Sequence, residues 1–251
     1  MMTTTQPTLL LIHGATGNSR MWDPVRRSLG SRWHIVTPDL PGHGSRRDEP
    51  FTLDAAVATV AAAAQAVAPA PVVVGGDSLG GYVSLASASA LPHDQLRGLV
   101  LAGASANFVG PALKALQRRW LSIRLMRTVL SERLLSAMVA KELRKMGIPA
   151  ADVESIVGCG LNSRVFGECV QALQGIDFRA KVAAVEQPVL VLNGSRDRIF
   201  IDQEDAFIAA ARRPTRHRFE GFDHGISLRC PAEFARQVEV FVAGLQQAAR
   251  Q

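Results

Sequence analysis

The stretch "VVVGGDSLGGY", residues 72–82, places one serine among glycines between a β-branched run and a helical pattern. A short β-branched run predicts a buried strand, and the residues from Leu79 onward have helical spacing. Ser78 therefore stands at a strand-to-helix turn, at the centre of the G-x-S-x-G pattern of residues 76–80. The positions two before and two after the apex of such a turn are crowded, so both favour glycine. The strained turn exposes the hydroxyl at the carboxyl end of a strand, where the N–H groups of the starting helix also point.

The same alternation of strand and helix recurs along the chain and predicts a mostly parallel sheet with helices on both faces. The predicted strands are 8–12, 34–37, 72–75, 99–102, 189–193 and 216–220. The predicted helices are 22–29, 53–68, 79–90, 203–211 and 231–247. The sequence therefore predicts an α/β fold.

One long segment interrupts this alternation. Residues 108–181 contain no convincing strand and read as amphipathic helices separated by glycine and proline. We call this stretch the lid segment, because a helical insertion of this length is expected to lie over one end of the sheet. The predicted division is a core of residues 1–107 and 182–251 with a helical lid of residues 108–181.

The composition is that of a globular protein. Of the 251 residues, 47% are hydrophobic and 20% are charged, and no apolar run approaches the roughly 18 residues of a membrane span. Residues 1–8 lack the charged and apolar regions of a signal peptide, so we expect a cytoplasmic protein without stable membrane insertion. The odd count of three cysteines favours reduced thiols over a disulfide between Cys159 and Cys169.

The positive charge is concentrated in the lid segment. Residues 111–145 hold nine basic and two acidic residues, whereas the formal net charge of the whole chain is +6. Such a surplus either attracts an anionic substrate or carrier or is simply a solvated helix face. No nucleic-acid-binding motif accompanies it, so a nucleic-acid partner is not expected.

A serine nucleophile needs a base and a group that orients the base, and two residues fit these roles. Asp197 lies in the loop after the strand "VLVLNG", and His224 lies in a glycine-flanked loop after the last predicted strand. Because the carboxyl ends of parallel strands meet at one edge of a sheet, Ser78, Asp197 and His224 are expected to converge.

The order Ser, Asp, His is that of the α/β-hydrolase superfamily, which the chain resembles, in its cap-bearing branch of esterase-like and C–C-hydrolase-like enzymes. The stretch "LLLIHGATGNSRMW", residues 9–22, resembles the family's H-G-x-x-G oxyanion segment, and "VTPDLPGHGSR", residues 36–46, resembles its D-x-x-G-x-G-x-S loop. The resemblance implies that Ser78 is the nucleophile, His224 the base and Asp197 the acid. It also implies that the backbone N–H groups of Ala15 and Leu79 form the oxyanion hole, and that His13, Asp39 and His43 are structural.

Three other aspartates are open to interpretation. Asp202 is expected to cap the helix after Asp197, and Asp223 has no assigned role. Asp77 either raises the negative potential beside Ser78 or hydrogen-bonds the turn, and the sequence does not decide between these. In the lid, the apolar residues Leu121, Ile123, Leu125, Met126, Val129 and Leu130 are too crowded for one narrow stripe, so some are expected to line the acyl pocket or pack on the core.

The expected function is that of a cofactor-independent serine hydrolase acting on a small carboxylic ester. Thioesters, C–C bonds and perhydrolysis are alternatives on the same triad, as is a slow-turnover ligand receptor with this fold. No metal, nucleotide or flavin motif is present in the sequence, and nothing in it indicates the oligomeric state.

Overall fold

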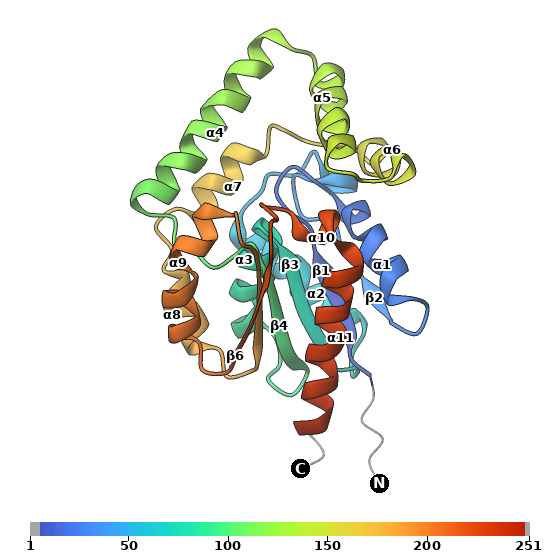
Figure 1. Cartoon of the computed structure of the whole chain (residues 1–251), viewed down its shortest axis with the longest axis vertical. Coiled ribbons are helices and arrows are strands. Elements are labelled where there is room, and N and C mark those ends of the chain that lie inside the picture. Colours follow the sequence, from blue (N-terminus) through green and yellow to red (C-terminus); the bar gives the residue numbers. More distant parts are fainter. Residues whose placement is uncertain (1–5, 249–251) are drawn as a thin grey trace.

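The structure is a computed structural model that describes residues 6–248, so part of the N-terminal stretch considered above as a leader lies outside the described residues. It contains one six-stranded parallel sheet in the order β2-β1-β3-β4-β5-β6 (Figure 1). The strands are β1 (Thr8–Ile12), β2 (Ile35–Val36), β3 (Val72–Asp77), β4 (Leu96–Ala102), β5 (Val189–Gly194) and β6 (Pro214–Phe219). The predicted α/β fold with a parallel sheet is confirmed.

Helices cover both faces of the sheet and one of its ends. They are α1 (Asp23–Leu29), α2 (Leu53–Ala66), α3 (Leu79–Ser87), α4 (Gly110–Val129), α5 (Glu132–Lys145), α6 (Ala150–Gly158), α7 (Phe166–Leu173), α8 (Phe178–Ala184), α9 (Arg198–Ala210), α10 (Ile226–Arg229) and α11 (Pro231–Ala248). Short 3₁₀ turns occupy Ser19–Trp22, Gly44–Arg46 and Ala88–Ala90.

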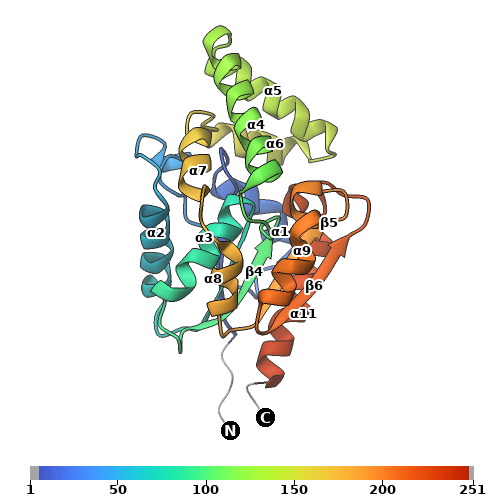
Figure 2. The ribbon, with the colours of Figure 1, turned by 90° about the vertical axis from the view of Figure 1, so that its left-hand side faces the viewer.

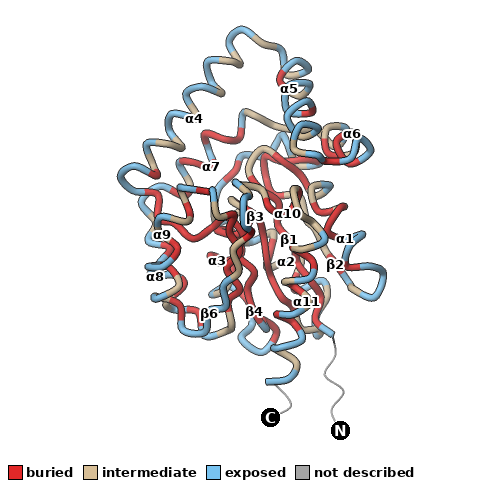
Figure 3. The backbone as a smooth tube through the Cα atoms, in the orientation of Figure 1, coloured by how far each residue is buried: buried red, intermediate tan, exposed pale blue. Residues whose placement is uncertain are grey.

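The core follows from the two-residue period of the strands. In β1, Leu9 and Leu11 pack with the buried residues of α1 and α11, whereas Leu10 and Ile12 pack with those of α2, α3, α8 and α9. All four side chains are essentially inaccessible to solvent, and the buried strands run through the centre of the molecule (Figure 3). A strand that is apolar on both faces is what a parallel sheet covered by two helical layers requires.

All six predicted strands are present, but several boundaries differ. β4 begins at Leu96 and not at residue 99. The exposed Arg97 interrupts the apolar run, so the sequence pattern does not indicate the first residues of this strand. β6 begins at Pro214 and is largely polar, as an edge strand can be. The three cysteines are free, as expected.

The prediction for Asp202 is wrong. Helix α9 begins at Arg198, so Asp202 lies inside the helix and Asp197 occupies the position before its first residue. The apolar residues Ile199 and Phe200 are compatible with either a loop or a first helical turn, and the sequence alone gave no clear start signal there.

The lid segment contains only helices and connections between them. Helices α4 to α7 lie beyond the carboxyl ends of the strands, with α4 and α5 outermost (Figures 1 and 2). Helix α4 packs on α7, and α5 packs on α6. The predicted boundary at residue 181 falls within α8, which packs on α3 and α9 beside the sheet. We keep the division into core and lid as a proposal, with the boundary placed before α8.

Candidate active site

Ser78 occupies a strained turn between β3 and α3. Its backbone angles are φ 57° and ψ −118°, a region that residues with side chains rarely adopt. A Cβ atom on Gly80 would lie 2.0 Å from the carbonyl oxygen of Ile12, and one on Gly76 would lie 2.3 Å from the carbonyl carbon of Gly80. The two glycines that flank the serine are therefore required by close backbone packing, as the sequence pattern predicts.

His224 and Asp197 meet at the same edge of the sheet. Asp197 follows β5 and His224 follows β6, and His224 Nδ1 lies 2.6 Å from Asp197 Oδ2. Asp197 is buried, with 7% of its surface exposed. The ring of Phe200 stacks on the imidazole, with centroids 5.1 Å apart and planes inclined by 15°. The imidazole is thus held by a carboxylate at one nitrogen and by an aromatic ring on one face.

The electrostatic surroundings favour the charged form of His224. Burial alone would lower its pKa, but the hydrogen bond that His224 donates to Asp197 and the negative charges of Asp77 and Asp197 outweigh burial and raise the pKa above 6.5. The charge of Arg119 acts in the opposite direction. A histidine in this setting can accept a proton readily.

Ser78 and His224 approach the same two residues at the end of β4. The N–H of Ser78 donates to the carbonyl oxygen of Ala102 at 2.7 Å. A Cβ atom on Gly103, where φ is 53°, would lie 2.8 Å from His224 Cε1. The turn of Ser78 and the loop of His224 therefore both lie beside Ala102 and Gly103.

The predicted oxyanion segment lies against Ser78. A Cβ atom on Gly14 would lie 3.6 Å from Ser78 Cβ, which places the backbone leading to Ala15 beside the serine. His13 is fully buried: its Nε2 accepts from the N–H of Leu40 at 3.1 Å and its Nδ1 lies 2.9 Å from the carbonyl oxygen of Gly14. Burial lowers the pKa of His13, so the imidazole is neutral and braces the loop.

Asp39 also has structural contacts only. Its carboxylate accepts from the N–H of Ser19 at 2.7 Å, and from both the N–H and the hydroxyl of Ser45 at 2.9 and 2.8 Å. His43 is buried beside His13, with ring centroids 4.8 Å apart. These contacts tie together the two loops that follow β1 and β2.

Two residues near the site were not singled out from the sequence. They are Phe200, which stacks on His224, and Ser227, which follows His224 in the chain. Ser227 is buried and its hydroxyl donates to Asp77 Oδ2. Nothing local in the sequence indicates either contact, because each joins segments far apart in the chain. Asp223, by contrast, is exposed and lies 3.4 Å from Arg229 in a surface ion pair.

The lid segment is tied to the loops beside Ser78 by amide side chains. Asn18 is fully buried, and its Nδ2 donates to the carbonyl oxygens of Ile156 at 2.8 Å and Gly160 at 3.1 Å. Asn162 Nδ2 donates to the carbonyl oxygen of Gly42 at 2.8 Å. The connection from α6 to α7 is therefore fixed to the core.

The outer lid helices carry an exposed apolar and basic surface. Eight large apolar side chains are exposed among the described residues, and seven of them lie in the lid segment: Val109, Leu121, Leu125, Val129, Leu134, Met138 and Val139. Of the six apolar residues of which some are expected to line a pocket or pack on the core, Ile123, Met126 and Leu130 are half-buried. Leu121, Leu125 and Val129 are 58%, 67% and 78% exposed, so these three do neither. Their spacing places them on the outer side of α4.

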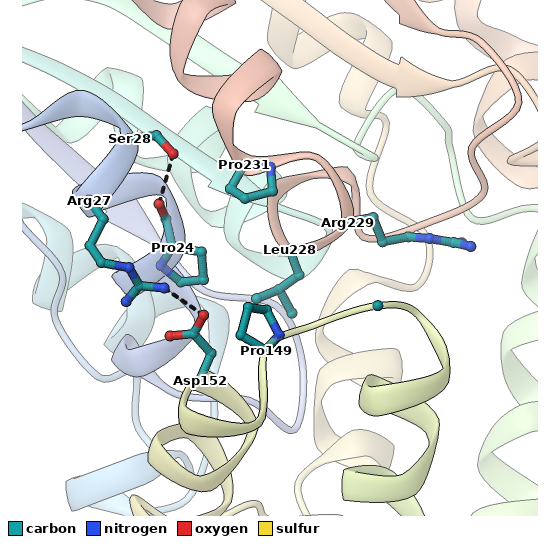
Figure 4. A pocket seen from close by; sticks show the side chains of 9 residues that line it. Pro24, Arg27, Ser28, Pro149, Asp152, Leu228, Arg229 and Pro231 are labelled. Carbon is teal, nitrogen blue, oxygen red and sulfur yellow. Dashed lines mark hydrogen bonds and ion pairs between the residues drawn. The ribbon is translucent and has the colours of Figure 1, made fainter.

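A cavity of about 370 Å³ lies between α1, the start of α6 and the turn from α10 to α11 (Figure 4). Arg27 and Asp152 face each other at its rim, 2.5 Å apart, and Leu228 and Pro149 supply apolar walls. Ser78, Asp197 and His224 are not among its lining residues.

The profile of the Alpha/beta hydrolase family matches residues 9–237, nearly the whole chain. The chain belongs to the alpha/beta hydrolase family. A methyl ester esterase of Neisseria meningitidis that acts on pimeloyl-[acyl-carrier protein] is 31% identical over 198 residues, which are 75% of this chain and 74% of that protein. A pyrrolizixenacetamide deacetylase of Xenorhabdus hominickii is 28% identical over 94% of this chain and 91% of its own length.

Solved structures show the same fold. E-2-(acetamidomethylene)succinate hydrolase superposes with a TM-score of 0.79 at 20% sequence identity, over 96% of this chain and 93% of that one. The relatives are hydrolases, and this member of the alpha/beta hydrolase family is a hydrolase. None of the helices between residues 6 and 248 combines the length and apolarity needed to cross a bilayer.

Proposed function

We propose that the protein is a serine hydrolase of small carboxylic esters, with Ser78 as nucleophile, His224 as general base and acid, and Asp197 as the carboxylate that orients His224. The observation that carries this proposal is the 2.6 Å contact between His224 Nδ1 and Asp197 Oδ2, at the sheet edge where Ser78 stands in a strained turn. Three residues from three separate loops share this edge, as acyl transfer requires.

The contact with Asp197 assigns a role to each of the two imidazole nitrogens of His224. Nδ1 carries the proton and donates to Asp197, so Nε2 is the atom that accepts the proton of Ser78. Ser78 Oγ then bonds to the carbonyl carbon, and the oxyanion accepts from the backbone N–H groups of Ala15 and Leu79. Collapse of this intermediate breaks the bond to the alcohol oxygen, which takes the proton from Nε2. Water repeats the sequence on the acyl-enzyme and releases the acid and Ser78.

The Neisseria relative supports ester cleavage over the alternatives on the same triad, because it is named as a methyl ester esterase. The Xenorhabdus relative is named as a deacetylase, which supports hydrolysis of an acyl group without favouring an ester. Thioester or C–C hydrolysis, perhydrolysis and slow-turnover binding would use the same residues, and a panel of substrates separates them.

Labelling with a fluorophosphonate tests the nucleophile. The wild-type protein is expected to gain the mass of one adduct, located on the peptide that contains Ser78, because an activated serine attacks the phosphorus centre. Ser78→Ala is expected to give no adduct, and His224→Ala a strongly slowed one. Intact-mass spectrometry and peptide mapping give the readout.

Two labelling results would contradict the proposal. An adduct on a serine other than Ser78, or no adduct on protein shown to be folded by circular dichroism, would overturn the proposal. In the second case the slow-turnover receptor becomes the favoured function, and thermal-shift screening of ligands follows.

We also propose that the ester is presented on an acidic carrier protein, which docks on α4 and α5. These two helices hold nine basic and two acidic residues in residues 111–145, and their outer side also exposes apolar side chains. A second copy of this chain would bring two like-charged surfaces together, whereas an acidic partner is complementary. The Neisseria relative is named for an ester bound to an acyl-carrier protein.

Charge reversal on the outer helix tests the carrier. Arg118→Glu combined with Arg124→Glu, both exposed positions of α4, is expected to raise KM for an ester on acyl-carrier protein by about tenfold, since each exposed charge pair contributes up to about 1 kcal/mol. KM for the corresponding free methyl ester is expected to stay the same. Steady-state kinetics at two salt concentrations provide the measurement.

Arg97→Glu is the matched control for this experiment. Arg97 is also exposed but lies near the start of β4, at the opposite end of the sheet from the lid. A rise in KM shared by the free ester, or produced equally by Arg97→Glu, would contradict docking on α4.

A further inference from the structure

Asp77 is a buried carboxyl group that the proposed mechanism does not use. It is the last residue of β3, directly before Ser78, and only 4% of its surface is exposed. Removing a carboxylate from water costs several kcal/mol unless charge or hydrogen bonds compensate. The groups that surround Asp77 therefore show what compensates for the burial of this carboxyl group.

One oxygen of Asp77 is bound to the loop that carries His224. Asp77 Oδ2 accepts from the hydroxyl of Ser227, which is 2% exposed and lies three residues after His224, in α10. The loop before α10 contains Gly225 in a left-handed conformation, with φ 83° and ψ 40°. The bond thus joins the strand that leads to Ser78 to the segment just beyond the proposed base.

The other oxygen faces the imidazole side of the site. Among the described residues, Asp77 Oδ1 has no hydrogen-bond partner. The position of a Cβ atom on Gly103 is 3.6 Å from Asp77 Oδ1 and 3.0 Å from His224 Nδ1. A side chain at residue 103 would therefore intrude between the carboxylate and the imidazole, and glycine leaves that space open.

Three charged residues act on the His224 imidazole. Asp197 and Asp77 are negative and raise its pKa, and Arg119 is positive and lowers it. The pKa of Asp77 is itself raised: burial, the largest cause, and the charge of Asp197 raise it, whereas the charge of His224 and the hydrogen bonds from Ser227 oppose the rise. Two carboxylates, from β3 and from the loop after β5, thus act on one imidazole.

We propose that Asp77 is a positioning residue that holds the His224 loop through Ser227 and places a second negative charge beside the imidazole. The charge stabilises the imidazolium that forms when Ser78 attacks the carbonyl carbon. This inference rests on the proposed function, because it takes His224 as the base.

Asp77→Asn separates the charge of this residue from its shape. Asparagine keeps the size and an oxygen that can accept from Ser227, but removes the negative charge. A neighbouring opposite charge raises the pKa of a histidine, so its removal lowers that pKa. The acidic limb of kcat/KM against pH, where His224 becomes protonated, is therefore expected to move to lower pH by about one unit. The plateau kcat is expected to fall roughly tenfold, the equivalent of one unit of pKa.

Asp223→Asn is the matched control. Asp223 is adjacent to His224 in the chain, but it is exposed and pairs with Arg229. The acidic limb of kcat/KM against pH for Asp223→Asn is therefore expected to coincide with that of the wild type. An acidic limb of Asp77→Asn that also coincides with the wild type would overturn the inference and leave Asp77 as a purely structural contact.

A second measurement covers the case in which Asp77→Asn does not fold. Asp77→Ser also removes the negative charge and leaves the hydrogen bond between Asp197 and His224 in place. The His224 pKa measured by NMR titration is expected to be lower in Asp77→Ser than in the wild type, because one of the charges that raise it is gone; an unchanged His224 pKa would overturn the inference.

Failure of this inference is distinguishable from failure of the proposed function. A wild-type protein that is labelled on Ser78 and hydrolyses esters, with an unshifted Asp77→Asn profile, retains the proposed function and loses only the role of Asp77. A folded wild-type protein that is not labelled on Ser78 fails at the earlier step.

Discussion

Ser78→Ala is expected to lower kcat for a carboxylic ester by about 10⁴-fold or more, a loss of roughly 5.5 kcal/mol of transition-state stabilisation. The hydroxyl is the atom that forms the acyl bond, and alanine offers no substitute. The backbone N–H groups beside Ser78 stay in place, so KM is expected to change little. Steady-state hydrolysis of aryl and alkyl esters gives both constants.

Ser122→Ala is the control for that substitution. Ser122 lies on the exposed surface of α4 and donates only to the carbonyl oxygen of Arg118 in its own helix, so its activity is expected to match the wild type. Retention of more than about one hundredth of the activity in Ser78→Ala, free of contaminating esterase, would mean that another group performs the attack.

Asp197→Asn is expected to lower kcat by about 10⁴-fold, although the substitution changes only one atom of the side chain. The carboxylate oxygen that lies 2.6 Å from His224 Nδ1 accepts a hydrogen bond, and an amide group can instead present a donor there. The imidazole would then carry its proton on Nε2, the nitrogen that has to receive the proton of Ser78. The rate of labelling by a fluorophosphonate is expected to fall in parallel.

Asp202→Asn provides the comparison, since it is the same change five residues along the chain. Asp202 is exposed inside α9, so this variant is expected to keep wild-type kinetics. A small loss in Asp197→Asn, similar to that of Asp202→Asn, would show that Asp197 does not orient the base.

The sheet and the turn at Ser78 could be predicted from local sequence, because both leave a pattern in neighbouring residues of the chain. A strand buried on both faces must be apolar at nearly every position, and β1, β3 and β5 are. The flanking glycines of the turn belong to a five-residue pattern around Ser78 that is visible locally, although one of the backbone segments that requires them, at Ile12, is distant in the chain. The buried strands and the turn at Ser78 can therefore both be recognised in a single sequence.

The surroundings of the site depend on contacts between distant segments, which leave no local signature. The stacking of Phe200 on His224 and the bond from Ser227 to Asp77 join residues 24 and 150 positions apart in the chain. The lid was predicted as helical, yet the helical pattern did not distinguish the outer side of α4 from the side that packs on α7, since apolar residues occupy both.

The buried amide of Asn18 also limits which part of the lid segment can change position. It fixes the end of α6 to the loop after β1, whereas α5 joins the other end of α6 and α4 begins on the far side of the molecule, near α9 (Figure 1). A change in the position of the two outer helices would leave the fixed end of α6 and the groups around Ser78 in place. Substitutions on the outer helices could then alter which acyl groups enter, with no cost to the chemistry beneath them, so specificity can diverge between related proteins faster than mechanism.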